Sequence, residues 1–160
     1  MQLGKNFKLY PEVATKLWDY GSCSWGEFPV QVIGSFTLRL LRKGEEEKVA
    51  QIWATGFPEL FRGTYGFVLN PKSYDIFFGG EWRMFIFETE DGQIAGARIL
   101  RMDFANLSAE FVLVVVLPEH RNKGLAKTVA HITDKYIEKC GVELATVSVA
   151  RFHNATLKIF

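Results

Sequence analysis

The sequence has few of the features that mark several large classes of protein. It holds only two cysteines, Cys23 and Cys140, and their separation is not a metal-ligand spacing, so we expect two thiols in a reducing compartment rather than a disulfide. No apolar run approaches the roughly 18 residues of a membrane span, and the N-terminus lacks the apolar core of a signal peptide. The formal net charge of +1 gives no reason to expect a nucleic acid or a membrane surface as partner. These absences predict a cytoplasmic protein.

Two familiar phosphate-binding loops are also missing. A Walker A loop needs G-x-x-x-x-G-K-[ST], and the dinucleotide fingerprint needs G-x-G-x-x-G; the chain has neither. His131 and His153 have no partners at metal-ligand spacing, so no metal site is expected. The length of 160 residues, of which 48% are apolar and 23% charged, is that of one ordinary globular domain.

The stretch on which the rest of the chain is organised runs from residue 109 to 130. Its apolar run, Phe111 to Leu117, is rich in β-branched residues and predicts a buried strand that Pro118 ends. A basic turn follows, and the apolar spacing after it predicts a helix that reaches Lys139. A turn between a strand and a helix directs free N–H groups toward one point, at the positive end of the helix dipole. Because Gly124 allows close backbone approach, the turn predicts a site for a phosphate.

The same stretch resembles the core motif of the GNAT superfamily of N-acetyltransferases. The family pattern is a strand with V-x-P-E-x, then [RQ]-x-x-G-x-[GA], then a helix. Here it stands as Val116-Leu-Pro-Glu-His120 followed by Arg121-Asn-Lys-Gly-Leu-Ala126. The six-residue part alone is a weak signal, but between a strand and a helix it is fairly specific.

The resemblance implies a cradle for the pyrophosphate of acetyl-CoA, with no metal. The cradle consists of Arg121, Asn122, Lys123, Gly124, Leu125 and Ala126. Backbone amides of the last three and of Asn122 would do most of the binding, with Arg121 and Lys123 acting through their side chains. The alternative is a basic helix end that touches only solvent. On the strand, the Val114 N–H becomes the candidate oxyanion donor and Val116 the partner of the pantetheine arm; a plain core strand is the alternative.

Glu110 is the candidate general base. Acetyl transfer needs a neutral amine, and a carboxylate near the thioester, acting directly or through water, can supply one. Strict alternation along the strand would place Glu110 on the same face as Val112 and Val114. Asp103 and Glu88 are weaker candidates, and a strand-end glutamate facing water is the alternative.

The C-terminal tail departs from the family pattern. His153 and Asn154 stand where many members hold the CoA arm through an asparagine, and Phe160 falls on the place of the tyrosine that often protonates the departing thiolate. Phenylalanine cannot do this, so the thiolate is expected to leave unassisted. Members normally continue into two further strands, which indicates either a piece of a longer protein or another segment in their place. The resulting open sheet edge predicts a possible homodimer.

The remaining elements follow the order of that family. Two hairpins are predicted from the Gly34-Ser35 and Asp91-Gly92 turns, a helix over residues 45–55, a loop or broken helix over 57–67, a helical turn over 73–78 and a strand over 144–150. A helix between two strands makes those strands parallel. The prediction is an α/β fold: a GNAT-like mixed, mostly antiparallel sheet with a central parallel pair and helices on both faces. We divide it into an extension, 1–35, and a domain, 36–160.

The predicted function is transfer of an acetyl group from acetyl-CoA to a primary amine, carried by a small molecule or a peptide, by direct attack. The alternative is a non-catalytic acyl-CoA-binding or structural domain of a longer protein. The acceptor is expected between the aromatic segment 57–67 and the hairpin tips.

Overall fold

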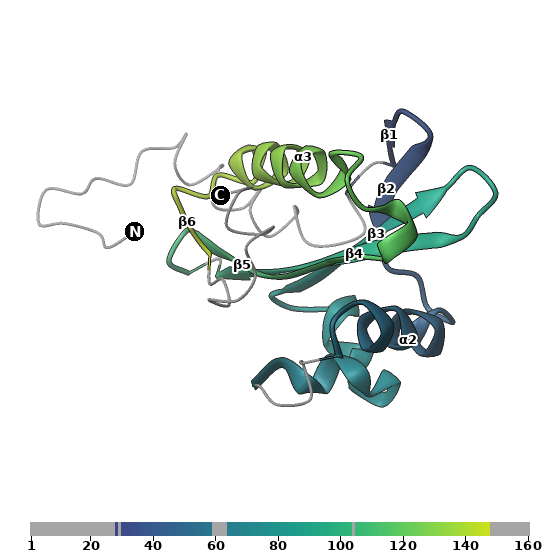
Figure 1. Cartoon of the computed structure of the whole chain (residues 1–160). Helices are drawn as coiled ribbons and strands as arrows, with labels where there is room; N and C mark the ends of the chain where they lie inside the picture. Colours follow the sequence, from purple (N-terminus) through teal and green to yellow (C-terminus); the bar gives the residue numbers. More distant parts are fainter. Residues whose placement is uncertain (1–27, 29, 59–63, 104, 148–160) are drawn as a thin grey trace, which may run out of the picture.

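The computed structural model describes residue 28 and residues 30–58, 64–103 and 105–147. They form a sheet of six strands between two layers of helix (Figure 1). The strands lie in chain order: β1 (Gln31–Ile33), β2 (Phe36–Leu40), β3 (Trp82–Thr89), β4 (Ile94–Asp103), β5 (Ser108–Val116) and β6 (Leu144–Val147). Neighbours are antiparallel except β5 and β6, which are parallel. This confirms the predicted mixed sheet, and the parallel pair stands last in the described order.

Both predicted hairpins are present. Gly34 has φ +59° between β1 and β2, and Gly92 has φ +81° between β3 and β4, as tight turns of this kind require. The sheet begins at Gln31, so the hairpin prediction is confirmed while the boundary at residue 35 stays a prediction.

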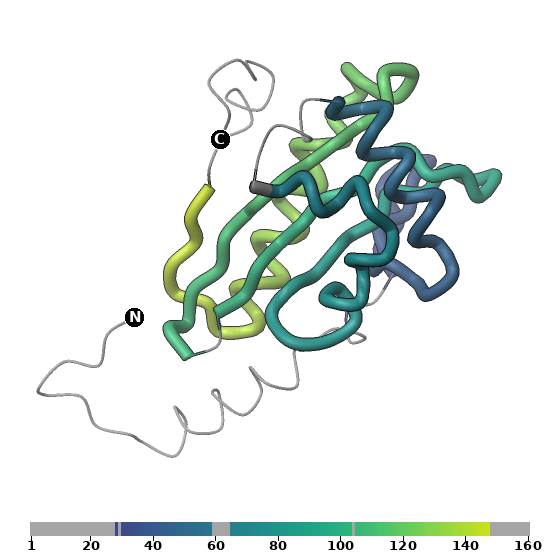
Figure 2. Tube along the Cα trace, turned by 90° about the horizontal axis from the view of Figure 1, so that it is seen from below, coloured from purple at the N-terminus to yellow at the C-terminus, as the bar shows by residue number. Residues whose placement is uncertain are grey.

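Helix α2 (Glu46–Gly56) covers one face of the sheet together with two 3₁₀ segments, η2 (Thr64–Leu69) and η3 (Pro71–Phe78). Figure 2 shows these three segments lying across the strands. Trp53 and Tyr74 are buried beneath them against Ile86 and Ile99 of the sheet. The helical turn predicted over 73–78 is thus a longer 3₁₀ segment with Pro71 in its first turn.

Helix α3 (Leu125–Lys139) covers the opposite face. It buries Val129, Tyr136 and Ile137 against Phe85 and neighbouring apolar side chains. Ile132 is only half-buried, whereas Thr133 beside it is buried and donates its hydroxyl to the Val129 carbonyl at 2.8 Å. Gly141 follows the helix with φ +84°, a left-handed conformation that commonly ends a helix and suits glycine.

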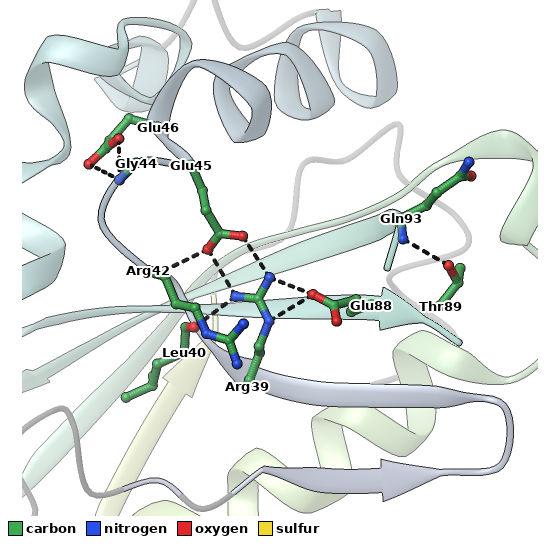
Figure 3. Close-up of polar contacts among 9 residues, drawn as sticks. All are labelled: Arg39, Leu40, Arg42, Gly44, Glu45, Glu46, Glu88, Thr89 and Gln93. Atoms are coloured by element: carbon green, nitrogen blue, oxygen red, sulfur yellow. Dashed lines mark hydrogen bonds and ion pairs between the residues drawn. The ribbon is translucent and has the colours of Figure 1, made fainter. Parts of the chain in front are cut away.

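A buried arginine ties the start of α2 to the sheet (Figure 3). Arg39 of β2 donates two hydrogen bonds to Glu45, at 2.9 and 2.6 Å, and two to Glu88 of β3, at 2.9 and 2.6 Å. Its remaining N–H binds the carbonyl of Leu40 at 3.2 Å, so all five guanidinium donors are used. Burial opposes the charge of Arg39, but its hydrogen bonds to the two carboxylates outweigh this effect and raise its pKa.

A bulge in β5 changes which side chains share a face. Ile99 of β4 pairs with Leu113, but the next residue of β4 pairs with Phe111, so Val112 is an extra residue. Val112 packs on the α2 side, whereas Val114 packs on the α3 side with Phe111. The prediction that Glu110 and Val114 share a face by strict alternation was therefore wrong.

Candidate functional site

The turn between β5 and α3 presents a row of unused backbone donors. A 3₁₀ segment, η4 (Pro118–His120), follows β5, and Asn122 and Gly124 then adopt left-handed conformations with φ +63° and +74°. The N–H groups of residues 122–127 have no acceptor among the described residues, since the first bond of the helix runs from the Thr128 N–H to the Gly124 carbonyl. They lie at the positive end of the α3 dipole, which favours an anion there.

Gly124 leaves the space over this turn open. A Cβ built on it would meet no heavy atom within 4 Å, and its φ is one that L side chains rarely adopt. Glycine is thus required by the backbone rather than by crowding from the protein. The arrangement can bind a phosphate group through backbone donors alone.

One side of the Arg121 guanidinium is hydrogen-bonded to backbone carbonyls of the protein. Its Nε donates to the Val116 carbonyl at 2.7 Å and its Nη2 to the Gly56 carbonyl at 3.2 Å. The residue is nevertheless exposed, and the other N–H groups of its guanidinium have no acceptor among the described residues. Arg121 therefore fixes the turn to the ends of β5 and α2 and keeps donors for an anion.

The ring of Phe36 contacts the other side of the turn. The Lys123 Nζ lies 5.9 Å from the centroid of its ring, and the imidazole of His120 meets the ring edge-on at 5.7 Å. Lys123 is exposed, so its ammonium lies beside the turn at the water boundary. Contacts from two directions hold the conformation of the turn without a bound ligand.

Beyond the bulge, the backbone polar groups of alternate β5 residues face away from β4, on the side where β6 lies. Leu117 donates its N–H to the Ala95 carbonyl of β4 at 2.8 Å, and the Val115 carbonyl lies against Gly96 of β4. Because successive residues of a strand direct their polar groups to alternate sides, the N–H groups of Val114 and Val116 point away from β4.

On that side, described pairing between β5 and β6 ends at Phe111 and Val147. The Val114 N–H thus has no acceptor among the described residues, as an oxyanion donor requires. The Val116 carbonyl is already taken by Arg121, which leaves its N–H as the group available to a pantetheine arm.

Glu110 lies on the α2 face and is half-buried. Tyr65 of η2 donates its hydroxyl to Glu110 Oε1 at 3.3 Å. Burial raises the pKa of Tyr65, and the neighbouring Glu110 charge raises it further, so the phenol stays protonated as a donor. The rise per residue of a strand puts Glu110 about 10 to 13 Å along β5 from Val114, a separation that one water and a bound amine can span.

The weaker base candidates have other partners. Glu88 forms the ion pair with Arg39 at 2.6 Å. Asp103 accepts hydrogen bonds from the backbone and side-chain amides of Asn106, which lower its pKa. His153, Asn154 and Phe160 lie outside the described residues. Sequence reasoning missed Tyr65, since only the fold brings it to a residue 45 positions away.

Two further classes of site were searched among the described residues. There, no group of three or more His, Cys, Asp or Glu side chains is placed to hold a metal ion. Within the same ranges, every helix is too short or too polar to cross a membrane.

Comparison with known proteins gave a family and a fold. The model of the family described as "Acetyltransferase (GNAT) family" matches residues 54–158. A search of curated proteins found no match. Among solved structures, the ribosomal-protein-S5-alanine acetyltransferase from Vibrio fischeri is similar with a TM-score of 0.65 at 10% identity, covering 82% of this chain and 80% of its own.

Two other similar structures have been solved with ligands. The spermidine N-acetyltransferase from Vibrio cholerae, in complex with CoA and spermine, has a TM-score of 0.63 at 18% identity and covers 79% of this chain and 78% of its own. An aminoglycoside acetyltransferase from an uncultured soil metagenomic sample, in complex with sisomicin, has a TM-score of 0.61 at 14% identity. The match covers 78% of this chain and 84% of the other. At these identities the likeness establishes the fold.

Proposed function

The chain belongs to the GNAT family of acetyltransferases, and from this membership we propose that it transfers an acetyl group from acetyl-CoA to a primary amine. The observation that carries the proposal is the strand–turn–helix itself, in which the unused N–H groups of residues 122–127 meet at the end of the strand that carries the Val114 N–H. The N–H groups of residues 122–127 suit a pyrophosphate, and the Val114 N–H suits an oxyanion.

The proposed reaction is direct attack. The neutral amine adds to the thioester carbonyl carbon, and the Val114 N–H donates to the oxygen as it becomes negative. Glu110 accepts the proton that the amine loses, directly or through water. The carbon–sulfur bond then breaks, and the thiolate of CoA leaves and takes up a proton from solvent.

A covalent route has less support. Cys140 is the described cysteine, and it lies buried at the far end of α3 from the turn. A thiol at that place cannot reach an acetyl group held along β5.

A homodimer through the sheet edge remains part of the proposal. Leu144 and Val147 of β6, the last strand in the described order, are 56% and 40% exposed, and a second copy pairing at this edge would cover them. A spermidine N-acetyltransferase of similar fold from Vibrio cholerae is dodecameric. Light scattering should give twice the monomer mass; a monomer at all concentrations would reject this part.

The test of function is release of CoA thiol with a panel of primary amines: phenethylamine, spermidine, sisomicin and a peptide with an N-terminal alanine. Glu110→Gln should lower turnover about 10²–10⁴-fold near neutral pH, and the loss should shrink at high pH where the free amine is abundant. Asp103→Asn is the control and should retain turnover.

Two results would count against the proposal in different ways. An unchanged pH–rate profile in Glu110→Gln would remove the base from the mechanism. Binding of acetyl-CoA without turnover of any amine in the panel would favour the alternative of a non-catalytic acyl-CoA-binding domain.

A further inference from the structure

Three residues on adjacent strands form a row across the α2 face of the sheet. Trp82 of β3 pairs with Arg101 of β4, and Arg101 pairs with Glu110 of β5. The Arg101 guanidinium lies 5.6 Å from the centroid of the Trp82 ring. The candidate base is thus the last member of a row that runs from an aromatic ring through a cation to a carboxylate.

Segment η2 packs over this row and contacts the side chains at both of its ends. Tyr65 contacts Glu110 through its hydroxyl, and its ring lies 6.4 Å from the ring of Phe67. Phe67 in turn meets Trp82 edge-on at 5.7 Å. The five side chains therefore form a circuit of neighbours, in which Arg101 and Glu110 are linked only by the pairing of their strands. The three aromatic members of this circuit are only half-buried.

The carboxylates around the circuit differ in what they already bind. Glu81 pairs with Arg101 at 3.4 Å, and Asp103 holds Asn106. Glu110 has no cationic nitrogen of the described residues within ion-pair distance, and its described partner is the neutral Tyr65. The circuit thus offers one carboxylate for one ammonium group.

We propose that this circuit is the acceptor subsite, and that it takes a monoamine with a flat apolar body in preference to a polyamine. The inference rests on the proposed function and names its substrate class. The ammonium lies at Glu110, where it can lose its proton, and the apolar body packs against Tyr65, Phe67 and Trp82. Tyr65 acts as a positioning residue that orients the Glu110 carboxylate.

The charge of Arg101 disfavours a second ammonium. Neighbouring strands lie about 5 Å apart, so any group bound along the row is closer to Arg101 than the Debye length of about 8 Å at physiological ionic strength. The repulsion is therefore poorly screened. Glu81 offsets the charge of Arg101 only in part, because the two groups lie 3.4 Å apart and both side chains are exposed. Asp103 is already engaged by Asn106.

Binding can be tested without turnover. Saturation-transfer NMR should show contact between the ring protons of phenethylamine and the protein, and an equal concentration of spermidine should leave the signal in place. Trp82→Leu should reduce the signal at least fivefold. Phe78→Leu, at another half-buried aromatic residue of the α2 face, is the control and should retain it. Acetyl-CoA binding and circular dichroism, unchanged in both variants, would establish that they fold.

Kinetics supply the second readout. The kcat/KM for phenethylamine should exceed that for spermidine at least tenfold, and Trp82→Leu should raise the KM for phenethylamine with kcat unchanged. Tyr65→Phe should lower kcat and shift the pH–rate profile. Displacement of phenethylamine by spermidine, or a Trp82→Leu variant that binds phenethylamine as the wild type does, would overturn the inference. Binding at this subsite without acetylation of any amine would contradict the proposed function alone.

Discussion

Arg121, in the turn after β5, donates from its Nη2 to the carbonyl of Gly56, the last residue of α2 and 65 positions earlier in the chain. Helix α2 has no basic residue in its own last turn. Arg121 therefore supplies the cation that favours a helix C-terminus and satisfies one of its unused carbonyls. A residue predicted to bind phosphate also joins the turn to the helix that covers the other side of the sheet.

Replacement of Arg121 should therefore affect stability as well as binding. Arg121→Gln should lower the free energy of unfolding by about 1 kcal/mol, a fall of about 2–4 °C in melting temperature for a chain of this size. Arg121→Lys keeps the positive charge but loses the planar guanidinium, so its melting temperature should lie between those of the wild type and Arg121→Gln. If the melting temperature of Arg121→Gln equals that of the wild type, the contact with Gly56 does not contribute to stability in solution.

Gly96 should not tolerate a methyl group. A Cβ at this residue of β4 would lie 2.2 Å from the Val115 carbonyl oxygen and 2.9 Å from the Phe87 ring. A backbone atom of the neighbouring strand cannot move aside as a side chain can, so Gly96→Ala should cost about 3 kcal/mol in urea unfolding. The reverse change at the next residue, Ala97→Gly, should cost only about 1 kcal/mol. Equal losses would contradict the close approach of β4 and β5.

The contact of Arg39 with Glu45 predicts a dependence of stability on pH. Burial opposes the charge of Glu45, but the hydrogen bond with Arg39 and a second from the Arg42 backbone outweigh it and lower its pKa from the ordinary glutamate value. Because the folded pKa is the lower one, the stabilisation is complete above the unfolded value and is lost as pH falls through the folded value.

Unfolding measured from pH 7 to pH 3 tests this directly. The difference in free energy of unfolding between the wild type and Glu45→Gln should be constant above about pH 5.5 and shrink below the usual glutamate range. Glu47→Gln, at an exposed position of the same helix, is the control. A difference that grew on acidification would have the wrong sign for this ion pair.

Local patterns predicted the framework of the site. The β-branched run that ends at Pro118 and the glycine at position 124 specify β5, the turn and α3, because each signal acts within a few residues. The Asp91-Gly92 turn fixed the β3–β4 hairpin in the same way. Acidic residues at the start of α2 and the glycine at its end are the local signals behind the helix predicted over residues 45–55.

Contacts between distant residues were not predictable. Nothing in the β5 sequence indicates that Val112 is the extra residue of a bulge, since valine fits a regular strand equally well. The contact between Tyr65 and Glu110 depends on how η2 packs over the sheet, and the one between Arg121 and Gly56 on how α2 meets β5. Such relations follow from the packing of whole elements.

The central claim is that the turn at Gly124 binds acetyl-CoA, and calorimetry of acetyl-CoA binding tests it most directly. Gly124→Asp places a side chain and a negative charge where the phosphate would lie. Gly92→Asp is the matched control, because Gly92 also has a positive φ and open space around it but lies in the β3–β4 turn, outside the turn that precedes α3. We predict micromolar-scale binding by the wild type and Gly92→Asp, and a loss of at least tenfold, about 1.4 kcal/mol, in Gly124→Asp. Equal binding by all three proteins would contradict the claim.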